Sequence, residues 1–158
     1  MSQRVLFDTS TLIGAVLRPG SVPNQALRKA LDVYQLCSSA EMVAELERVL
    51  ARPHFAKYAS IDARAAFIDL IRRNAQMHVV TDLDLANLTP RCRDPKDDIV
   101  LALAVAANAD TIVSSDQGSA GAASLARGCY YDAGAVCRAI CSLRIFPYEY
   151  FPSASTLY

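Results

Sequence analysis

The sequence predicts an α/β fold in which helices cover both faces of a parallel sheet. Short apolar runs typical of buried strands alternate along the chain with longer segments of helical spacing. No internal repeat and no linker-like segment interrupts this alternation. Alternation of this kind requires crossover connections, which place helices on the faces of a parallel sheet. A chain of 158 residues suits one hydrophobic core, so we expect a single domain over residues 1–158.

The expected strands are short runs of apolar residues bounded by polar ones. They are residues 4–7, 35–39, 77–81, 111–115 and 129–132. From about residue 145 the chain has aromatic residues and two prolines without a regular period, and we expect an irregular tail there.

The expected helices carry start and stop signals. Residues 39–52 place their apolar side chains on one face, and Pro53 ends the helix. The other expected helices are residues 22–34, 60–75, 95–107 and 133–143, which follow the candidate capping residues Ser21, Ser60, Asp94 and Asp132. The segment that begins DLDLANLTPRC is expected to be a loop.

The charge, the apolar runs and the cysteines of the chain limit the classes of function that it can have. The formal net charge is zero, so no global positive field indicates a general nucleic-acid binder, although an enzyme that holds phosphates through metal ions remains possible. The apolar run 99–107 is too short to span a membrane, and Asp8 interrupts the N-terminal apolar stretch. We therefore expect a cytoplasmic protein without a membrane partner. The five cysteines form no CxxC pair and are expected to be buried, reduced thiols.

Acidic residues gather where strands end. Asp8 and Asp116 follow expected strands, Glu45 lies one turn into the helix after the second strand, and Asp97 and Asp98 lie in the first turn of the helix before the fourth. The carboxyl ends of parallel strands share one edge, so these carboxylates can converge there. A cluster of this kind needs a compensating cation, and oxygen-only ligands favour Mg²⁺ or Mn²⁺. Such ions typically act on phosphate esters.

Each acid also has a purely structural explanation. Asp8 could cap the following turn, and Glu45 could be a solvated helix residue. Asp97 could be a first-turn acid that the helix dipole stabilises, and Asp116 could form a turn in SSDQG. The common βα order of the four acids is the stronger signal.

The chain resembles a PIN domain and, within that superfamily, the toxin components related to VapC-type ribonucleases. The resembling segments are VLFDTSTLIGAVL, SSAEMVAELERVLARPHF, RDPKDDIVLALAVAANADTIVSSD and YYDAGAVCRAI. The resemblance implies a three-layer α/β/α sandwich around a parallel sheet and an acidic cluster that binds Mg²⁺ or Mn²⁺ and cuts RNA. It also implies an antitoxin protein as a partner and association into a homodimer.

Carried over residue by residue, the resemblance places the metal-binding and catalytic acids on Asp8, Glu45, Asp97 and Asp116. Ser10 falls where the family often has a polar residue near the metal. Asp98 stands where the related proteins usually have asparagine, and we expect Asp97 to be the inner ligand with Asp98 outside it.

Basic residues near the acids are candidates for RNA binding. They are Arg18, Arg93 and Lys96, whose alternative role is ordinary solvated surface charge. The stretch QGSAGAASL after Asp116 lacks the acidic, leucine-rich pattern of the family, which leaves the surroundings of the fourth acid open.

The sequence thus indicates a Mg²⁺- or Mn²⁺-dependent endoribonuclease, with a toxin role implied by the resemblance. The alternative is a catalytically inactive PIN-like interaction module. A haloacid dehalogenase phosphatase would need an aspartate where Ser10 stands. A receiver domain would need a lysine after a late strand, and TIVSSDQG has none.

Overall fold

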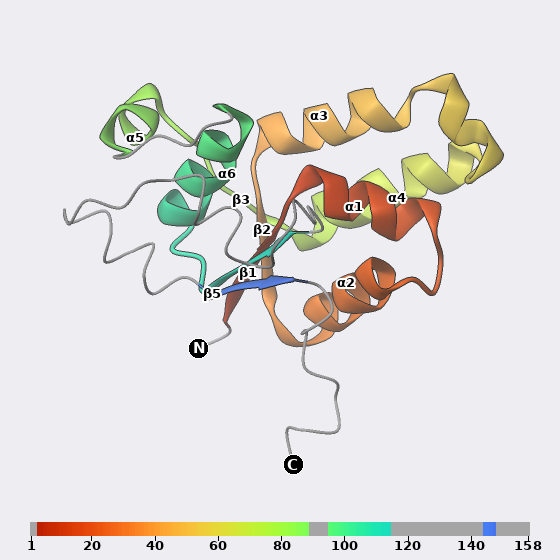
Figure 1. Ribbon diagram of the computed structural model, residues 1–158, viewed down its shortest axis with the longest axis horizontal. Coiled ribbons are helices and arrows are strands. Elements are labelled where there is room, and N and C mark those ends of the chain that lie inside the picture. The colour runs from red at the N-terminus through yellow and green to blue at the C-terminus, as the bar shows by residue number, and fades with distance from the viewer. Residues whose placement is uncertain (1–2, 89–94, 115–143, 148–158) are drawn as a thin grey trace, which may run out of the picture.

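A computed structural model describes residues 3–88, 95–114 and 144–147, and its strands form one parallel sheet (Figure 1). The strand order is β3-β2-β1-β4-β5, and every pair of neighbours is parallel. The strands are β1 Arg4–Phe7, β2 Gln35–Ser38, β3 Gln76–Met77, β4 Thr111–Ser114 and β5 Arg144–Pro147.

Helices connect the strands and cover the sheet. They are α1 Thr9–Leu17, α2 Val22–Val33, α3 Ala40–Leu50, α4 Ile61–Asn74, α5 Asp82–Asn87 and α6 Pro95–Ala106, with the 3₁₀ helix η1 at Pro53–Lys57. Ser60 caps α4 as predicted, because its hydroxyl accepts a hydrogen bond from the backbone N–H of Ala63 at 3.2 Å. Ser39 caps α3 in the same way through Met42.

The strands are apolar on both faces, which explains how the sheet becomes the middle of three layers. Val5 and Phe7 pack in one core cluster with residues of α1, α2, α3 and α4, whereas Leu6 between them packs in a second cluster with residues of α6. Ile112 and Val113 of β4 divide between the two clusters in the same way. Successive side chains of a strand point to opposite faces, so both faces are buried. The α/β/α sandwich with a central parallel sheet is confirmed.

Three segments differ from the sequence-based prediction. Residues 82–87, expected to be a loop, form α5 because Thr81 and Asp84 make a reciprocal capping box. The hydrogen bonds that Asp84 accepts from the side chain and backbone of Thr81 lower the pKa of this carboxyl group. Helix α1 is absent from the prediction, because TSTLIGAVL has no polar face that would reveal a helical period.

The third difference concerns the ends of the sheet. The irregular tail expected from about residue 145 begins instead with β5, which pairs with β4 from Arg144 to Pro147. Ile145 and Phe146 favour strands, and Pro147 is tolerated because β5 is an edge strand. The strand expected at 77–81 is reduced to Gln76–Met77 at the opposite edge. The strand expected at 129–132 and the helix expected at 133–143 lie outside the described residues.

Cys37 is buried and free, as expected, and burial raises the pKa of its thiol. The raised pKa keeps the thiol protonated and unreactive. The other cysteines lie outside the part of the chain that the structure describes. Among the helices in residues 3–88 and 95–114, none is long and apolar enough to cross a membrane.

Candidate functional site

Asp8 lies directly after β1 and caps the first turn of α1. Its Oδ1 accepts hydrogen bonds from the backbone N–H of Thr11 at 2.6 Å and from the hydroxyl of Ser10 at 3.0 Å. Its own backbone N–H donates to the carbonyl oxygen of Val113 in β4 at 3.1 Å. The capping role considered for Asp8 is therefore real, and the same contacts hold its carboxylate at the carboxyl edge of the sheet.

Asp8 also marks the point where the strand order reverses. The chain runs outward from β1 to β2 and β3, and then returns to place β4 on the other side of β1. Ligands of open parallel sheets bind outside the carboxyl ends of the strands at such a switch point. Because Phe7 pairs with Val113, the carboxyl ends of β1 and β4 lie side by side. The topology alone thus singles out the position of Asp8.

Glu45 belongs to α3, which starts at the carboxyl end of β2. Its side chain is 37% exposed and forms an ion pair with Arg48, with 3.6 Å between Oε1 and Nη2. Arg48 is 65% exposed, and an ion pair this open to water contributes little to stability. This ion pair therefore does not prevent the carboxylate of Glu45 from binding a metal ion.

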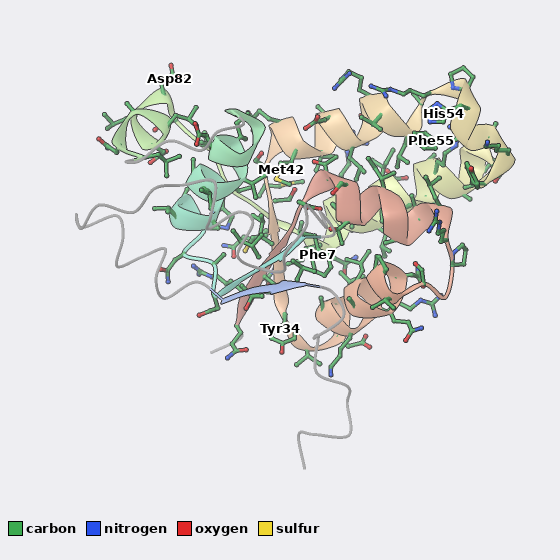
Figure 2. The ribbon with its side chains drawn as sticks, in the orientation of Figure 1. Phe7, Tyr34, Met42, His54, Phe55 and Asp82 are labelled. Atoms are coloured by element: carbon green, nitrogen blue, oxygen red, sulfur yellow. The ribbon has the colours of Figure 1, made fainter. Side chains whose placement is uncertain are left out.

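The start of α3 lies close to the layer that carries α6. Met42 belongs to the core cluster of Leu6 and Leu101, whereas Val43 and Leu46 belong to the cluster on the opposite face. Figure 2 shows Met42 at the beginning of α3, near the end of the sheet from which α1 departs. Helices α1 and α3 are thus in contact, and the start of α3 reaches the core cluster that contains residues of α6.

Asp97 and Asp98 are neighbouring acids of α6, and the structure describes the side chain of Asp98. Asp98 is 9% exposed and lies in the first turn of the helix, where the helix dipole favours a negative charge. The surrounding residues therefore shield Asp98 from most of the solvent. Asp97 is part of α6, but its side chain lies outside the described residues, so the preference for Asp97 as inner ligand stays a prediction.

The remaining predicted residues are distributed as follows. Asp116 and Arg93 lie outside the described residues, and the same holds for the side chain of Lys96. Arg18 is exposed and is the C-cap residue of α1, which puts it about 15 Å along the helix from Asp8. The structure therefore places Arg18 away from the acids and on the side of the molecule toward which α1 runs.

The described side chains alone do not make up a metal centre. Within residues 3–88, 95–114 and 144–147, no three side chains of His, Cys, Asp or Glu lie together in a way that could hold an ion. Asp8 and Glu45 supply carboxylate oxygens, the donors that hard divalent cations take. The donor chemistry therefore fits Mg²⁺ or Mn²⁺, with Asp97 and Asp116 as the further ligands that the sequence predicts.

The sequence-based prediction did not include two residues that contact these acids. Thr11 fixes the carboxylate of Asp8 through its backbone N–H, and the spacing of three residues between an aspartate and its capping partner could have identified it. Arg48 lies beside Glu45, and the helical spacing of three residues could have identified that pair as well.

A family model described as the PIN domain matches residues 4–118, which include β1, Glu45, α6 and Asp116. No curated protein matches the chain. PIN domains are generally nucleases, a class of hydrolases, and typically use divalent metal ions. The match covers most of the 158 residues and agrees with the parallel sheet and its covering helices. The chain therefore belongs to the PIN domain family.

Proposed function

We propose that this chain is a Mg²⁺- or Mn²⁺-dependent endoribonuclease that hydrolyses phosphodiester bonds of RNA and acts as the VapC-like toxin of a toxin–antitoxin pair. The observation that carries the proposal is the position of Asp8 at the switch point of a PIN-domain sheet. The choice of RNA and the toxin role rest on the sequence resemblance.

Asp8, Glu45, Asp97 and Asp116 would hold the ion in this proposal. Asp116 follows Ser114, the last residue of β4, by two positions in the sequence, and β4 lies beside β1 and Asp8. A divalent ion bound there would lower the pKa of an attacking water and stabilise charge on the phosphate.

The remaining residues at the edge would orient these acids. Thr11 and Ser10 hold one oxygen of Asp8, which fixes the direction in which the carboxylate presents its other oxygen. Asp98 would stay in the interior, outside the ligand set. Outer partners of this kind typically change metal affinity or activity by about 10- to 100-fold when removed.

The purified protein should cleave single-stranded RNA only when a divalent ion is present. Exhaustive chelation with EDTA should abolish cleavage, and Mn²⁺ or Mg²⁺ added in excess should restore it, because carboxylates without a cation repel the phosphate. Gel analysis of a labelled RNA over time measures both steps. Cleavage that persists after chelation contradicts metal dependence, and RNA left intact with Mn²⁺ present would favour the inactive interaction module.

The proposed partners are an antitoxin protein and a second copy of this chain. The resemblance supports both, and the C-terminal sequence FPYEYF is rich in aromatic residues, which are common in protein interfaces. Light scattering of the purified protein at high concentration should give the mass of a dimer. A strict monomer over the whole concentration range contradicts the homodimer.

A further inference from the structure

Helix α3 leads away from the candidate site to a tip formed by η1. It starts beside the carboxyl end of β2 and runs for 11 residues, about 16 Å, away from the sheet (Figure 1). Figure 2 shows His54 and Phe55 in η1, at the end of the molecule farthest from α5. The chain therefore runs from Glu45 along the rest of α3 directly to this tip.

The segment from Arg48 to Ala59 is strongly basic although the whole chain has no net charge. It contains Arg48, Arg52, Lys57 and His54 but neither aspartate nor glutamate. All four of these side chains belong to exposed residues. In a neutral protein, such a segment is a local site of positive potential.

The first cation of this segment, Arg48, lies on the same flank of α3 as Glu45. Glu47 is bound to Arg72 of α4 at 2.8 Å, so its flank faces α4. Positions 45 and 47 are about 160° apart around the helix, which places Glu45 and its ion-pair partner Arg48 on the flank away from α4. Arg52 lies two residues beyond the end of α3, directly before η1, and its side chain is exposed.

An exposed aromatic ring lies at the far end of the segment. Tyr58 is 53% exposed, and the ammonium group of Lys57 lies 4.8 Å from the centre of its ring. A single exposed aromatic residue is common on protein surfaces. Here the ring lies next to the cation of Lys57. Proteins bind single strands with cations that contact the phosphates and exposed rings on which a base stacks.

The position of this segment is fixed by the protein interior. The buried guanidinium of Arg64 in α4 donates hydrogen bonds to the carbonyl oxygens of Leu50 and Arg52. The connection between α3 and η1 is thereby held to α4, so its exposed cations project from a defined backbone.

We propose that Arg48, Arg52, Lys57 and Tyr58, named here the α3–η1 strip, bind single-stranded RNA and guide it to the acids. The proposal rests on the ribonuclease function proposed above and assigns its substrate path. Arg48 contacts the phosphate nearest Glu45, Arg52 and Lys57 contact phosphates farther along the strand, and Tyr58 stacks on a base at the outer end.

Neutralising the outer cations tests the phosphate contacts. The variant Arg52→Gln/Lys57→Gln should bind a fluorescent, mixed-sequence single-stranded RNA roughly fivefold or more weakly in EDTA, where no cleavage occurs. The slope of log K against log salt should fall by about 1.4, because each lost phosphate contact on a single strand removes about 0.7. Fluorescence anisotropy at several salt concentrations measures both quantities. The control Arg28→Gln/Arg73→Gln removes two exposed cations of α2 and α4 and should leave the slope unchanged.

Replacing Tyr58 tests the stacking contact. Tyr58→Ala should weaken RNA binding at least about fivefold without changing the salt slope, because a base–aromatic stack carries no net charge. Tyr58→Phe keeps the ring and should bind as the wild type does. Since Tyr58 is exposed and belongs to neither core cluster, circular dichroism should show the same fold for all of these proteins.

The outcomes separate this proposal from the proposed function. The strip variants could bind RNA with wild-type affinity and salt slope while the wild type cleaves RNA with Mn²⁺. That result would overturn the RNA-binding role of the strip but not the proposed ribonuclease function. Equal losses of affinity in the strip and control variants would also overturn the strip. They would mean that RNA binding depends on the total positive charge and not on the position of these cations. A wild type that neither binds nor cleaves RNA would overturn both.

Discussion

Replacement of Asp8 by asparagine should leave the protein folded and reduce RNA cleavage by more than about 100-fold, beyond the range typical of residues outside the ligand set. Asparagine caps a helix about as well as aspartate does, so the hydrogen bond from Thr11 to the side chain in position 8 can persist. The neutral amide, however, removes the negative charge that a divalent ion requires. The change therefore separates the capping role of Asp8 from its proposed metal role.

Cleavage rates of purified wild type and Asp8→Asn measure this effect, with thermal unfolding as a check on the fold. Asp62→Asn is the matched control, because Asp62 is an exposed acid in the first turn of α4, away from the carboxyl edge. It should cleave RNA at the wild-type rate. Equal rates for Asp8→Asn and Asp62→Asn would mean that Asp8 only caps α1.

Replacement of Arg64 by methionine should lower the free energy of unfolding by about 2–4 kcal/mol. Arg64 is 7% exposed, and its side chain donates to the carbonyl oxygens of Leu50, Arg52 and Ser60. The last carbonyl groups of a helix lack partners within the helix, and Leu50 is the last residue of α3. Methionine fills similar space but donates no hydrogen bond, so buried acceptors lose their partners.

Urea denaturation of both proteins measures the change. Arg73→Met is the control, because Arg73 is exposed on the same helix and its replacement should change stability by less than about 0.5 kcal/mol. If Arg64→Met unfolds at the wild-type urea concentration, the guanidinium does not stabilise the connection from α3 to α4. That result would also remove the support that Arg64 gives to the α3–η1 strip.

The elements that the sequence predicted well are those whose signals are local and periodic. Strands β1, β2 and β4 are short apolar runs, and α3 has a one-sided apolar face with a serine cap. Alternation of such elements was sufficient to predict a parallel sheet with helices on both faces. Helix α1 was not predicted because TSTLIGAVL has no one-sided apolar period, and its structure depends on the Asp8 cap and on burial of Thr11, Leu12 and Ala15.

Elements that depend on distant pairing could not be predicted in the same way. Strand β5 exists because Arg144–Pro147 pairs with β4, a contact between segments about 30 residues apart in the sequence. Strand β3 has two residues and pairs with β2 at the opposite edge of the sheet. Neither the edge position of a strand nor its length is encoded in its own residues.

The site could be predicted in part because parallel strands end at a common edge. That rule placed Asp8 correctly at the end of β1, and the structure adds that β4 lies directly beside it. The burial of Asp98 depends on side-chain packing, which a sequence pattern does not specify. The proposed ligand roles of Asp97 and Asp116 remain predictions from spacing and resemblance.

A crystal structure of the protein with Mn²⁺ tests the central claim most directly. Anomalous scattering locates the ion without reference to the expected ligands. We predict one or two ions at the carboxyl edge, with oxygens of Asp8, Glu45, Asp97 and Asp116 as ligands or one water away, and with an Asp97 oxygen nearer the ion than any Asp98 oxygen. Mn²⁺ bound elsewhere, or no ion beside Asp8 at millimolar Mn²⁺, would contradict the claim that these acids form a metal-dependent active site.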